Sequence, residues 1–321
     1  MAPAQAQAEP AALPPLVAIV GATGTGKSDL AISVAQRLGE HGLAAEIVNA
    51  DAMQLYRGMD IGTAKVPESE RKGIPHHLLD VWDVTQEASV SEYQTIARAA
   101  ILSIQARGVI PVLVGGSGLY VSSVLYEFEF PGTDPVVRAR WESRAREEGI
   151  EPLLEELAAQ DPLAAAAIDP QNTRRVIRAL EVIEITGKPF GAGLDAEHRP
   201  WQASTLIFGL QRERDELVEA LDRRVVEMWN NGLVDEVKNL IPQGIARGVT
   251  ASRAIGYQQV LEYLEGTLGE KEAIESTQSL TRRYARRQVS WFRRDANTRW
   301  LTSGEDGAVE TVLAAVTGLR P

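Results

Sequence analysis

The stretch Gly21-Ala22-Thr23-Gly24-Thr25-Gly26-Lys27-Ser28 follows the pattern G-x-x-x-x-G-K-S. An apolar run at 16–20 precedes it, and residues 29–35 follow it with apolar side chains at helical spacing, so the order is strand, tight loop and helix. In that setting the loop N–H groups, the helix N-terminus and Lys27 all attract phosphate, and the Ser28 hydroxyl can bind Mg²⁺. The complete, correctly flanked motif favours a bound di- or triphosphate over a glycine-rich turn without ligand. It does not say which molecule carries the phosphates.

The bulk composition indicates a soluble globular protein, with 44% hydrophobic and 24% charged residues in a chain of 321. This length allows one large α/β domain with an insertion, or two domains. No apolar run approaches the roughly 20 residues that span a bilayer, and residues 1–15 lack the basic start of a secretory signal, which predicts a disordered tail. The absence of cysteine excludes disulfides and thiolate sites and fits the cytoplasm. We therefore expect a cytoplasmic protein with no membrane partner.

Charge is distributed unevenly along the chain. The net charge of −11 argues against a nucleic-acid partner, but residues 281–294 hold six arginines and no acid. At helical spacing these arginines fall on one side, and the opposite side carries apolar residues with Gln288 among them. Residues 174–178 offer a second arginine cluster. Two such clusters favour a phosphate-binding surface over a merely solvated arginine face.

The order of predicted elements indicates a parallel, doubly wound sheet. Strands at 45–50, 75–83 and 109–114 alternate with helices, among them an amphipathic helix at 91–107. From 134 to 202 the pattern is helical only, and a strand at 205–210 resumes the sheet. We predict a P-loop α/β core at 16–133 and 203–321, a mainly helical insertion at 134–202 and a disordered tail at 1–15.

The strand at 109–114 limits the phosphate chemistry. ATPases and kinases of this loop class usually place a Mg²⁺-holding acid after such a strand, whereas this strand ends in Gly115-Gly116-Ser117-Gly118. Nucleotide hydrolysis is therefore disfavoured. A small-molecule kinase, with Asp51 or Asp80 as the acid, and a non-catalytic RNA-binding protein that uses the loop as a ligand sensor both stay open.

Seven stretches resemble, in order, the signatures of the tRNA dimethylallyltransferase family, also called tRNA isopentenyltransferases: residues 21–28, 49–65, 75–80, 115–120, 174–182, 254–257 and 281–294. The resemblance extends from about residue 16 to 301. It implies Mg²⁺-dependent transfer of a dimethylallyl group from dimethylallyl diphosphate to the exocyclic N6 of the adenine on the 3′ side of the anticodon. It also implies that a single chain, as a monomer, binds the anticodon stem-loop of tRNA.

The resemblance assigns roles to particular residues. Asp51 would accept the proton of the attacking amine, a role that general-base chemistry supports, and Thr23 would contact the diphosphate or close the site. The diphosphate would lie on residues 21–28, with Mg²⁺ on Ser28 and with Arg224, or alternatively its neighbour Arg223, beside it. The implied tRNA contacts are Asp51, Ala52, Met53, Gln54, Ser117, Arg138, Arg140, Arg174, Arg175, Val176, Ile177, Arg178, Arg253, Tyr257, Arg286, Arg287, Arg293 and Arg294. At Ser117 the family commonly has threonine. His76 and His77 are interpreted as structural.

Overall fold

A six-stranded parallel sheet forms the centre of the computed structural model, which describes residues 13–128, 130–191 and 199–318. The strand order is β3-β2-β4-β1-β5-β6, so the first strand lies inside the sheet and later strands extend it on both sides. The strands are β1 Leu16–Gly21, β2 Ala45–Asn49, β3 His76–His77, β4 Ile110–Gly115, β5 Thr205–Gln211 and β6 Thr298–Thr302. The predicted parallel α/β fold is confirmed.

The central strands are buried along their whole length, as the continuous apolar sequences of β1 and β4 require. Their register is fixed by parallel pairing, with Ile19 of β1 opposite Val114 of β4 and Phe208 of β5. The strand predicted at 75–83 shrinks to His76–His77, and β6 was not predicted at all. In β6, only Thr298 and Leu301 are buried, so its five residues carry a weak apolar signal.

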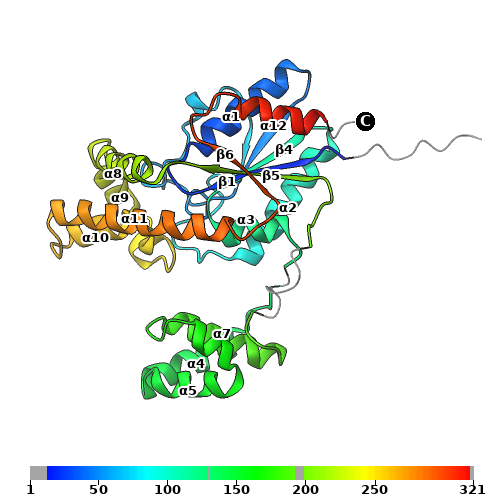
Figure 1. Cartoon of the computed structure of the whole chain (residues 1–321). Coiled ribbons are helices and arrows are strands. Elements are labelled where there is room, and N and C mark those ends of the chain that lie inside the picture. The colour runs from blue at the N-terminus through cyan, green and yellow to red at the C-terminus, as the bar shows by residue number, and fades with distance from the viewer. Residues whose placement is uncertain (1–12, 129, 192–198, 319–321) are drawn as a thin grey trace, which may run out of the picture. The chain divides into compact units, whose positions relative to one another are not determined.

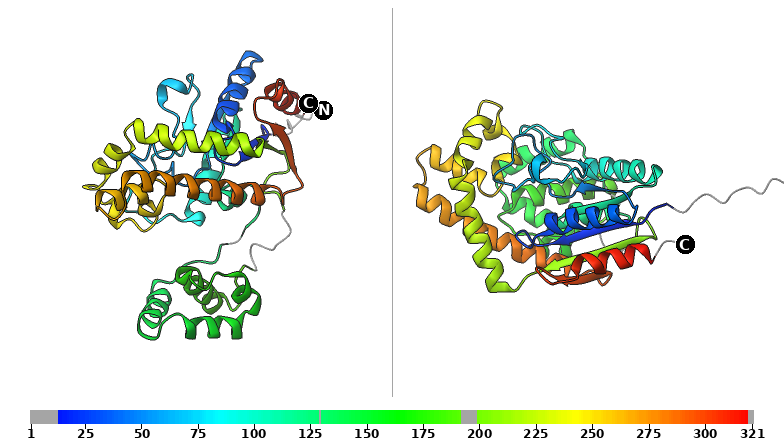
Figure 2. Two further views of the ribbon diagram at one scale, coloured as in Figure 1. Left: turned by 60° about the vertical axis from the view of Figure 1, so that its left-hand side comes forward. Right: turned by 90° about the horizontal axis from the view of Figure 1, so that it is seen from above.

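Helices cover both faces of the sheet. Helices α1 (Lys27–Glu40) and α12 (Ala308–Thr317) pack side by side on one face, where Val34, Leu38 and Val312 join the core of the strands. Figure 2 shows both helices running along the strands when the molecule is seen from above. On the opposite face lie α2 (Val90–Ala106), α3 (Gly118–Leu125) and α11 (Glu270–Phe292) (Figure 1).

Three further helices gather around α11, as Figure 1 shows: α8 (Arg214–Asn230), α9 (Leu233–Leu240) and α10 (Tyr257–Leu264). The apolar side of α8 and α11 contacts Ala22 through Leu217, Leu221 and Ala285. Ala22 directly follows β1, so these helices close over the carboxyl end of the central strand, where ligands of parallel α/β sheets bind. In the described part of the chain, no helix has the length and apolar character needed to cross a membrane.

Residues 126–201 form a second compact unit, inserted between the two parts of the first. Its helices are α4 (Pro135–Glu148), α5 (Glu151–Gln160), α6 (Pro162–Ala167) and α7 (Thr173–Thr186), which enclose their own apolar core around Trp141, Leu157 and Leu180. This unit starts earlier than the predicted insertion because Tyr126 and Glu127 pair with the returning chain at Pro200 and Arg199. Residues 1–12 of the predicted tail lie outside the described residues.

Candidate active site

The phosphate loop is closed by its own side chains. Gly24 and Gly26 have φ angles of 80° and 84°, a region that glycine enters without strain. The Thr25 hydroxyl donates to the Ala22 carbonyl at 2.9 Å, and Lys27 Nζ reaches back across the loop to the same oxygen at 2.6 Å. The ammonium therefore lies inside the loop and keeps two donors for a ligand.

Burial lowers the pKa of the Lys27 ammonium to about 8, and the nearby Asp51 carboxylate only partly offsets this. A phosphate anion beside the ammonium would restore the charge.

Asp51 is held by an asparagine that ends β2. The Asp51 N–H donates to Asn49 Oδ1 at 3.0 Å, and Asn49 Nδ2 donates to the Leu78 carbonyl at 3.0 Å, so two segments fix the turn. One carboxylate oxygen, Asp51 Oδ1, accepts the N–H of Met53 at 2.9 Å. Burial raises the pKa of the Asp51 carboxyl, with the positive charges of Lys27 and Arg224 acting in the opposite direction. A raised pKa makes this carboxylate a stronger base than an exposed aspartate.

Arg224 projects from α8 toward the phosphate loop. Its Nη2 donates to Thr23 Oγ1 at 2.8 Å, and its buried Nε has no hydrogen-bond partner among the described residues. An unpaired buried donor is costly, which is typical of a site that completes its hydrogen bonds with a ligand. Arg223, the alternative, is exposed and lies 3.7 Å from Glu227. The structure therefore places Arg224, and not Arg223, at the loop.

Two cavities meet at these residues. The first, of about 600 Å³, is lined by the phosphate loop, Gln54 and Lys65. The second, of about 310 Å³, is lined by Met53, Ser117 and a wall of side chains from α8 and α11. Four residues line both cavities: Thr23, Asp51, Thr63 and Arg224. A group bound in either cavity therefore faces the same carboxylate and guanidinium.

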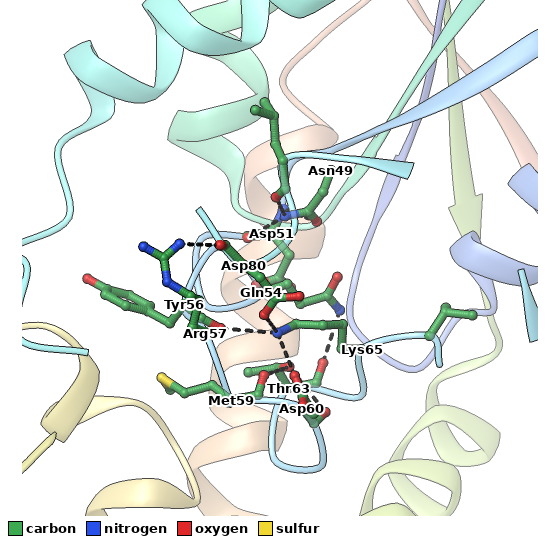
Figure 3. Close-up of polar contacts among 12 residues, drawn as sticks. Asn49, Asp51, Gln54, Tyr56, Arg57, Met59, Asp60, Thr63, Lys65 and Asp80 are labelled. Atoms are coloured by element: carbon green, nitrogen blue, oxygen red, sulfur yellow. Dashed lines mark hydrogen bonds and ion pairs between the residues drawn. The ribbon is translucent and has the colours of Figure 1, made fainter. Parts of the chain in front are cut away.

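The segment from Asp51 to Lys65 is held by a buried lysine (Figure 3). Lys65 Nζ donates to Asp60 Oδ1 and Asp80 Oδ1, each at 2.6 Å, and to the Tyr56 carbonyl at 3.1 Å, while only 4% of its side chain is exposed. All three ammonium donors are thus used. The network holds Asp80 in a left-handed conformation with φ of 58°, which is unfavourable for a non-glycine residue.

Gln54 is fixed by the same segment. Its Nε2 donates to the Thr63 carbonyl at 3.1 Å and to the Ala64 carbonyl at 3.5 Å, and the amide lines the first cavity. Thr63 was not predicted as a site residue, although it lies within the 49–65 stretch. Its hydroxyl is used internally, donating to the Met59 carbonyl at 2.7 Å.

Several predicted tRNA contacts line the second cavity. Ser117 Oγ accepts the Ala52 N–H at 3.1 Å and lies 3.4 Å from Tyr284 Oη, so the hydroxyl aligns the chain next to Asp51. Arg253 and Arg287 also line this cavity.

Tyr257 lines the second cavity but is buried, and its hydroxyl donates to the Glu236 carboxylate. That carboxylate also accepts the backbone N–H groups of Asp60, Ile61 and Gly62 at 2.7–3.3 Å. Tyr257 thus helps to hold the 51–65 segment through Glu236. Its hydroxyl is hydrogen-bonded within the protein and is not assigned to RNA. Arg286, Arg293 and Arg294 lie exposed at and beyond the C-terminal part of α11.

The helical unit carries the remaining predicted contacts. Arg138 and Arg178 pair with Glu181 at 3.3 and 2.8 Å, and Arg140 pairs with Glu184. Arg174 and Arg175 are exposed at the start of α7. Val176 and Ile177 lie in the core of this unit because they occupy the inner side of α7, so we assign them to packing and not to RNA contact.

A phosphate loop at the end of a parallel sheet, with a half-buried aspartate and arginine shared by two cavities, fits the class of transferases that act on a phosphorylated substrate. The comparisons specify the family. The model of the IPP transferase family matches residues 54–295. The tRNA dimethylallyltransferase of Clavibacter sepedonicus is 56% identical over 307 residues, covering 96% of this chain and 99% of that protein. That of Mycobacterium tuberculosis is 56% identical over 292 residues, covering 90% of this chain and 92% of that protein.

Solved structures agree. The tRNA isopentenylpyrophosphate transferase of Bacillus halodurans superposes with a TM-score of 0.68 at 39% identity, covering 95% of this chain and 96% of that one. A eukaryotic dimethylallyltransferase captured acting on tRNA gives a TM-score of 0.78 at 27% identity, covering 94% of this chain and 78% of that one. The chain belongs to the tRNA dimethylallyltransferase family.

Proposed function

We propose that this protein transfers the dimethylallyl group of dimethylallyl diphosphate to N6 of the adenosine on the 3′ side of the tRNA anticodon, releasing diphosphate. The names of its relatives support the reaction. The observation that carries the proposal for this chain is that Asp51, Thr23 and Arg224 line both the phosphate cavity and the second cavity. A diphosphate in one cavity and an adenine in the other would meet at these side chains.

The transfer step needs one base, Asp51, and one leaving group, the diphosphate. The N6 lone pair forms a bond to C1 of the dimethylallyl group, the bond from C1 to the diphosphate oxygen breaks, and the N6 proton passes to the Asp51 carboxylate. An exocyclic adenine amine is a weak nucleophile, and a positioned base contributes roughly 10²- to 10⁴-fold.

The leaving diphosphate needs positive charge near its bridging oxygen. Lys27 lines the first cavity together with Gly24, Gly26 and Ser28 of the loop, and Arg224 lines both this cavity and the second. Donors already in place cost no reorganisation when charge develops, which is why such arrangements supply a large share of catalysis. Thr23 orients Arg224 through its hydroxyl.

Residues of the first cavity fit Mg²⁺. The Ser28 hydroxyl lines the cavity beside Asp29 and makes no hydrogen bond within the described ranges. The described residues form no cluster of three or more metal-ligating side chains, and Mg²⁺ commonly binds through one or two protein oxygens, substrate phosphates and water. We propose Ser28 as its protein ligand. The bound ion would neutralise part of the diphosphate charge.

RNA must present an unstacked base to the second cavity, at a cost of a few kcal/mol. We propose that Ala52, Met53 and Gln54 contact the extruded adenine and that arginines of both units bind backbone phosphates of the same RNA. The arginines are Arg253, Arg286, Arg287, Arg293 and Arg294 of the core and Arg138, Arg140, Arg174, Arg175 and Arg178 of the helical unit. One chain lines both cavities, which supports a functional monomer.

The test is incubation of the protein with Mg²⁺, dimethylallyl diphosphate and unmodified tRNA, followed by nucleoside analysis. We expect prenylated adenosine, and we expect Asp51→Asn to lower kcat by roughly 10²- to 10⁴-fold with tRNA affinity kept. ATP turnover without prenylated RNA would instead favour a small-molecule kinase. Unchanged activity of Asp51→Asn would refute the assignment of the base.

A further inference from the structure

Gln288 is a polar residue buried on the inner side of α11, with 4% of its surface exposed. Its side-chain amide uses both ends. Oε1 accepts the backbone N–H of Thr23 at 2.8 Å, and Nε2 donates to the Gly116 carbonyl at 2.7 Å. The amide therefore joins the phosphate loop after β1 to the loop after β4.

The chemistry of the two partners fixes the orientation of this amide. A backbone N–H can only donate and a backbone carbonyl can only accept, so the flipped amide would face two like groups. Space is also fixed, because a Cβ built on Gly116 would lie 2.4 Å from Gln288 Nε2. Glycine at 116 is therefore what permits this close approach.

Both partners lead directly to the reacting groups. Thr23 holds Arg224 through its hydroxyl, so a shift of the Thr23 backbone moves the guanidinium that faces the diphosphate. Gly116 precedes Ser117, whose hydroxyl aligns the Ala52 N–H next to Asp51. Gln288 touches neither substrate cavity itself, and its amide acts through these neighbours.

The same helix borders the cavity proposed for the adenine. Tyr284 and Arg287, one turn before Gln288 and next to it, line the second cavity, and Arg286 is exposed. Ala285 of the same helix and Ala22 of the phosphate loop belong to one apolar cluster, so helix and loop are joined by apolar packing as well as by the amide. A ligand that shifts α11 from its outer side would therefore also shift the phosphate loop, which is hydrogen-bonded to Gln288 on the inner side of the same helix.

We propose that Gln288 is a positioning residue that couples RNA binding on α11 to diphosphate binding in the loop. The proposal rests on the proposed function, since it takes RNA as the partner of the second cavity. Coupling of this kind is reciprocal: RNA tightens the diphosphate site, and diphosphate tightens the RNA site by the same factor.

The experiment measures the Kd of inorganic diphosphate with Mg²⁺, in the presence and absence of an unmodified anticodon stem-loop RNA, by calorimetry on the full chain. We expect RNA to lower this Kd at least about fivefold in the wild type. In Gln288→Met, which keeps the length but loses both hydrogen bonds, the factor should fall below about twofold, while the Kd for RNA alone changes less than about threefold. The kcat of transfer should fall about tenfold or more.

Gln105→Met is the matched control. Gln105 of α2 is also a buried glutamine that bridges two segments, donating to the Pro14 carbonyl at 2.7 Å and to Gln202 Oε1 at 2.8 Å. Its partner Pro14 precedes β1, so these hydrogen bonds lie at the opposite end of that strand from the phosphate loop. The control variant should lose stability and keep the coupling factor. If Gln288→Met does not fold, Gly116→Ala provides the second variant, since its methyl group must displace the same amide.

A wild type without coupling, or a Gln288→Met variant that couples as Gln105→Met does, would overturn the inference. Either result would leave the proposed function standing as long as the wild type prenylates tRNA. A wild type that makes no prenylated tRNA would refute the proposed function instead.

Discussion

At the scale of single residues, opposite pKa shifts prepare Asp51 and Lys27 for their proposed roles. Burial raises the pKa of the carboxyl and lowers that of the ammonium, and each charge partly stabilises the other. The pair is therefore most completely charged between the two pKa values. Both groups line the first cavity. We expect the pH dependence of catalysis to report the Asp51 carboxyl and that of diphosphate binding to report the Lys27 ammonium.

The Asp51 prediction concerns the acid side of the pH profile. The carboxyl works as a base only when ionised, so kcat should decline as pH falls through an apparent pKa above the ordinary aspartate value of about 3.9. Single-turnover transfer rates from pH 4.5 to 8 measure this. Asp51→Asn should retain only a slow rate without that acid limb, and an unchanged limb in the variant would assign it to another group.

The Lys27 prediction concerns the basic side. The ammonium binds an anion only when protonated, so the affinity of the free protein for inorganic diphosphate should decrease as pH rises through about 8. Calorimetry in buffers of different ionisation enthalpy should also detect proton uptake on binding above that pH. Lys27→Met should bind weakly at every pH, and a step near pH 8 that survives in this variant would contradict the assignment.

At the scale of elements, the site depends on an irregular segment and one long helix. Residues 51–65 contain no regular helix or strand, yet Lys65 on one side and Glu236 on the other hold the segment through backbone and carboxylate groups. Helix α11 presents arginines outward and Gln288 inward. In each of the two elements, some side chains line a cavity or face solvent while others hold the element in place through hydrogen bonds.

Replacing Lys65 should loosen the irregular segment. Lys65→Met removes three hydrogen bonds, and because Asp60 and Asp80 are about half exposed, the free energy of unfolding should drop by a moderate amount, about 1–3 kcal/mol. Denaturant unfolding measures the loss, and kcat should fall because the Gln54 anchor shifts. Lys271→Met, at an exposed lysine of α11 that lies 3.8 Å from Glu275, is the control and should stay within about 0.5 kcal/mol.

The outer side of α11 should govern the salt dependence of tRNA binding. Each phosphate contact releases counterions, so the double variant Arg286→Ala/Arg287→Ala should flatten the plot of log K against log[salt] by about one to two units of slope. Arg37→Ala, in α1 on the other face of the sheet and paired with Glu40 and Glu310, should leave the slope unchanged. Equal slopes for all three proteins would place the RNA elsewhere.

At the scale of the whole molecule, the features that the sequence predicts are those determined by residues close together in the chain. The phosphate loop, the strand that precedes it and the parallel order of the sheet follow from local spacing. The supports do not: Gln288 reaches Thr23 across 265 positions, and Glu236 reaches Ile61 across 175. Gln288 did leave one signal, a polar residue among the apolar ones of its helix. The short strand β6 left almost none, because only two of its side chains are buried.

The central claim is that Asp51 stands between an isoprenoid diphosphate and the adenine that receives it. The most direct measurement is a crystal structure of this protein with an unmodified anticodon stem-loop and a non-cleavable analogue of dimethylallyl diphosphate. We predict an Asp51 carboxylate oxygen about 2.6–3.2 Å from the adenine N6, with C1 of the analogue on the other side of that nitrogen and the diphosphate on residues 21–28. An adenine bound away from the second cavity, or a carboxylate turned away from N6, would contradict the account.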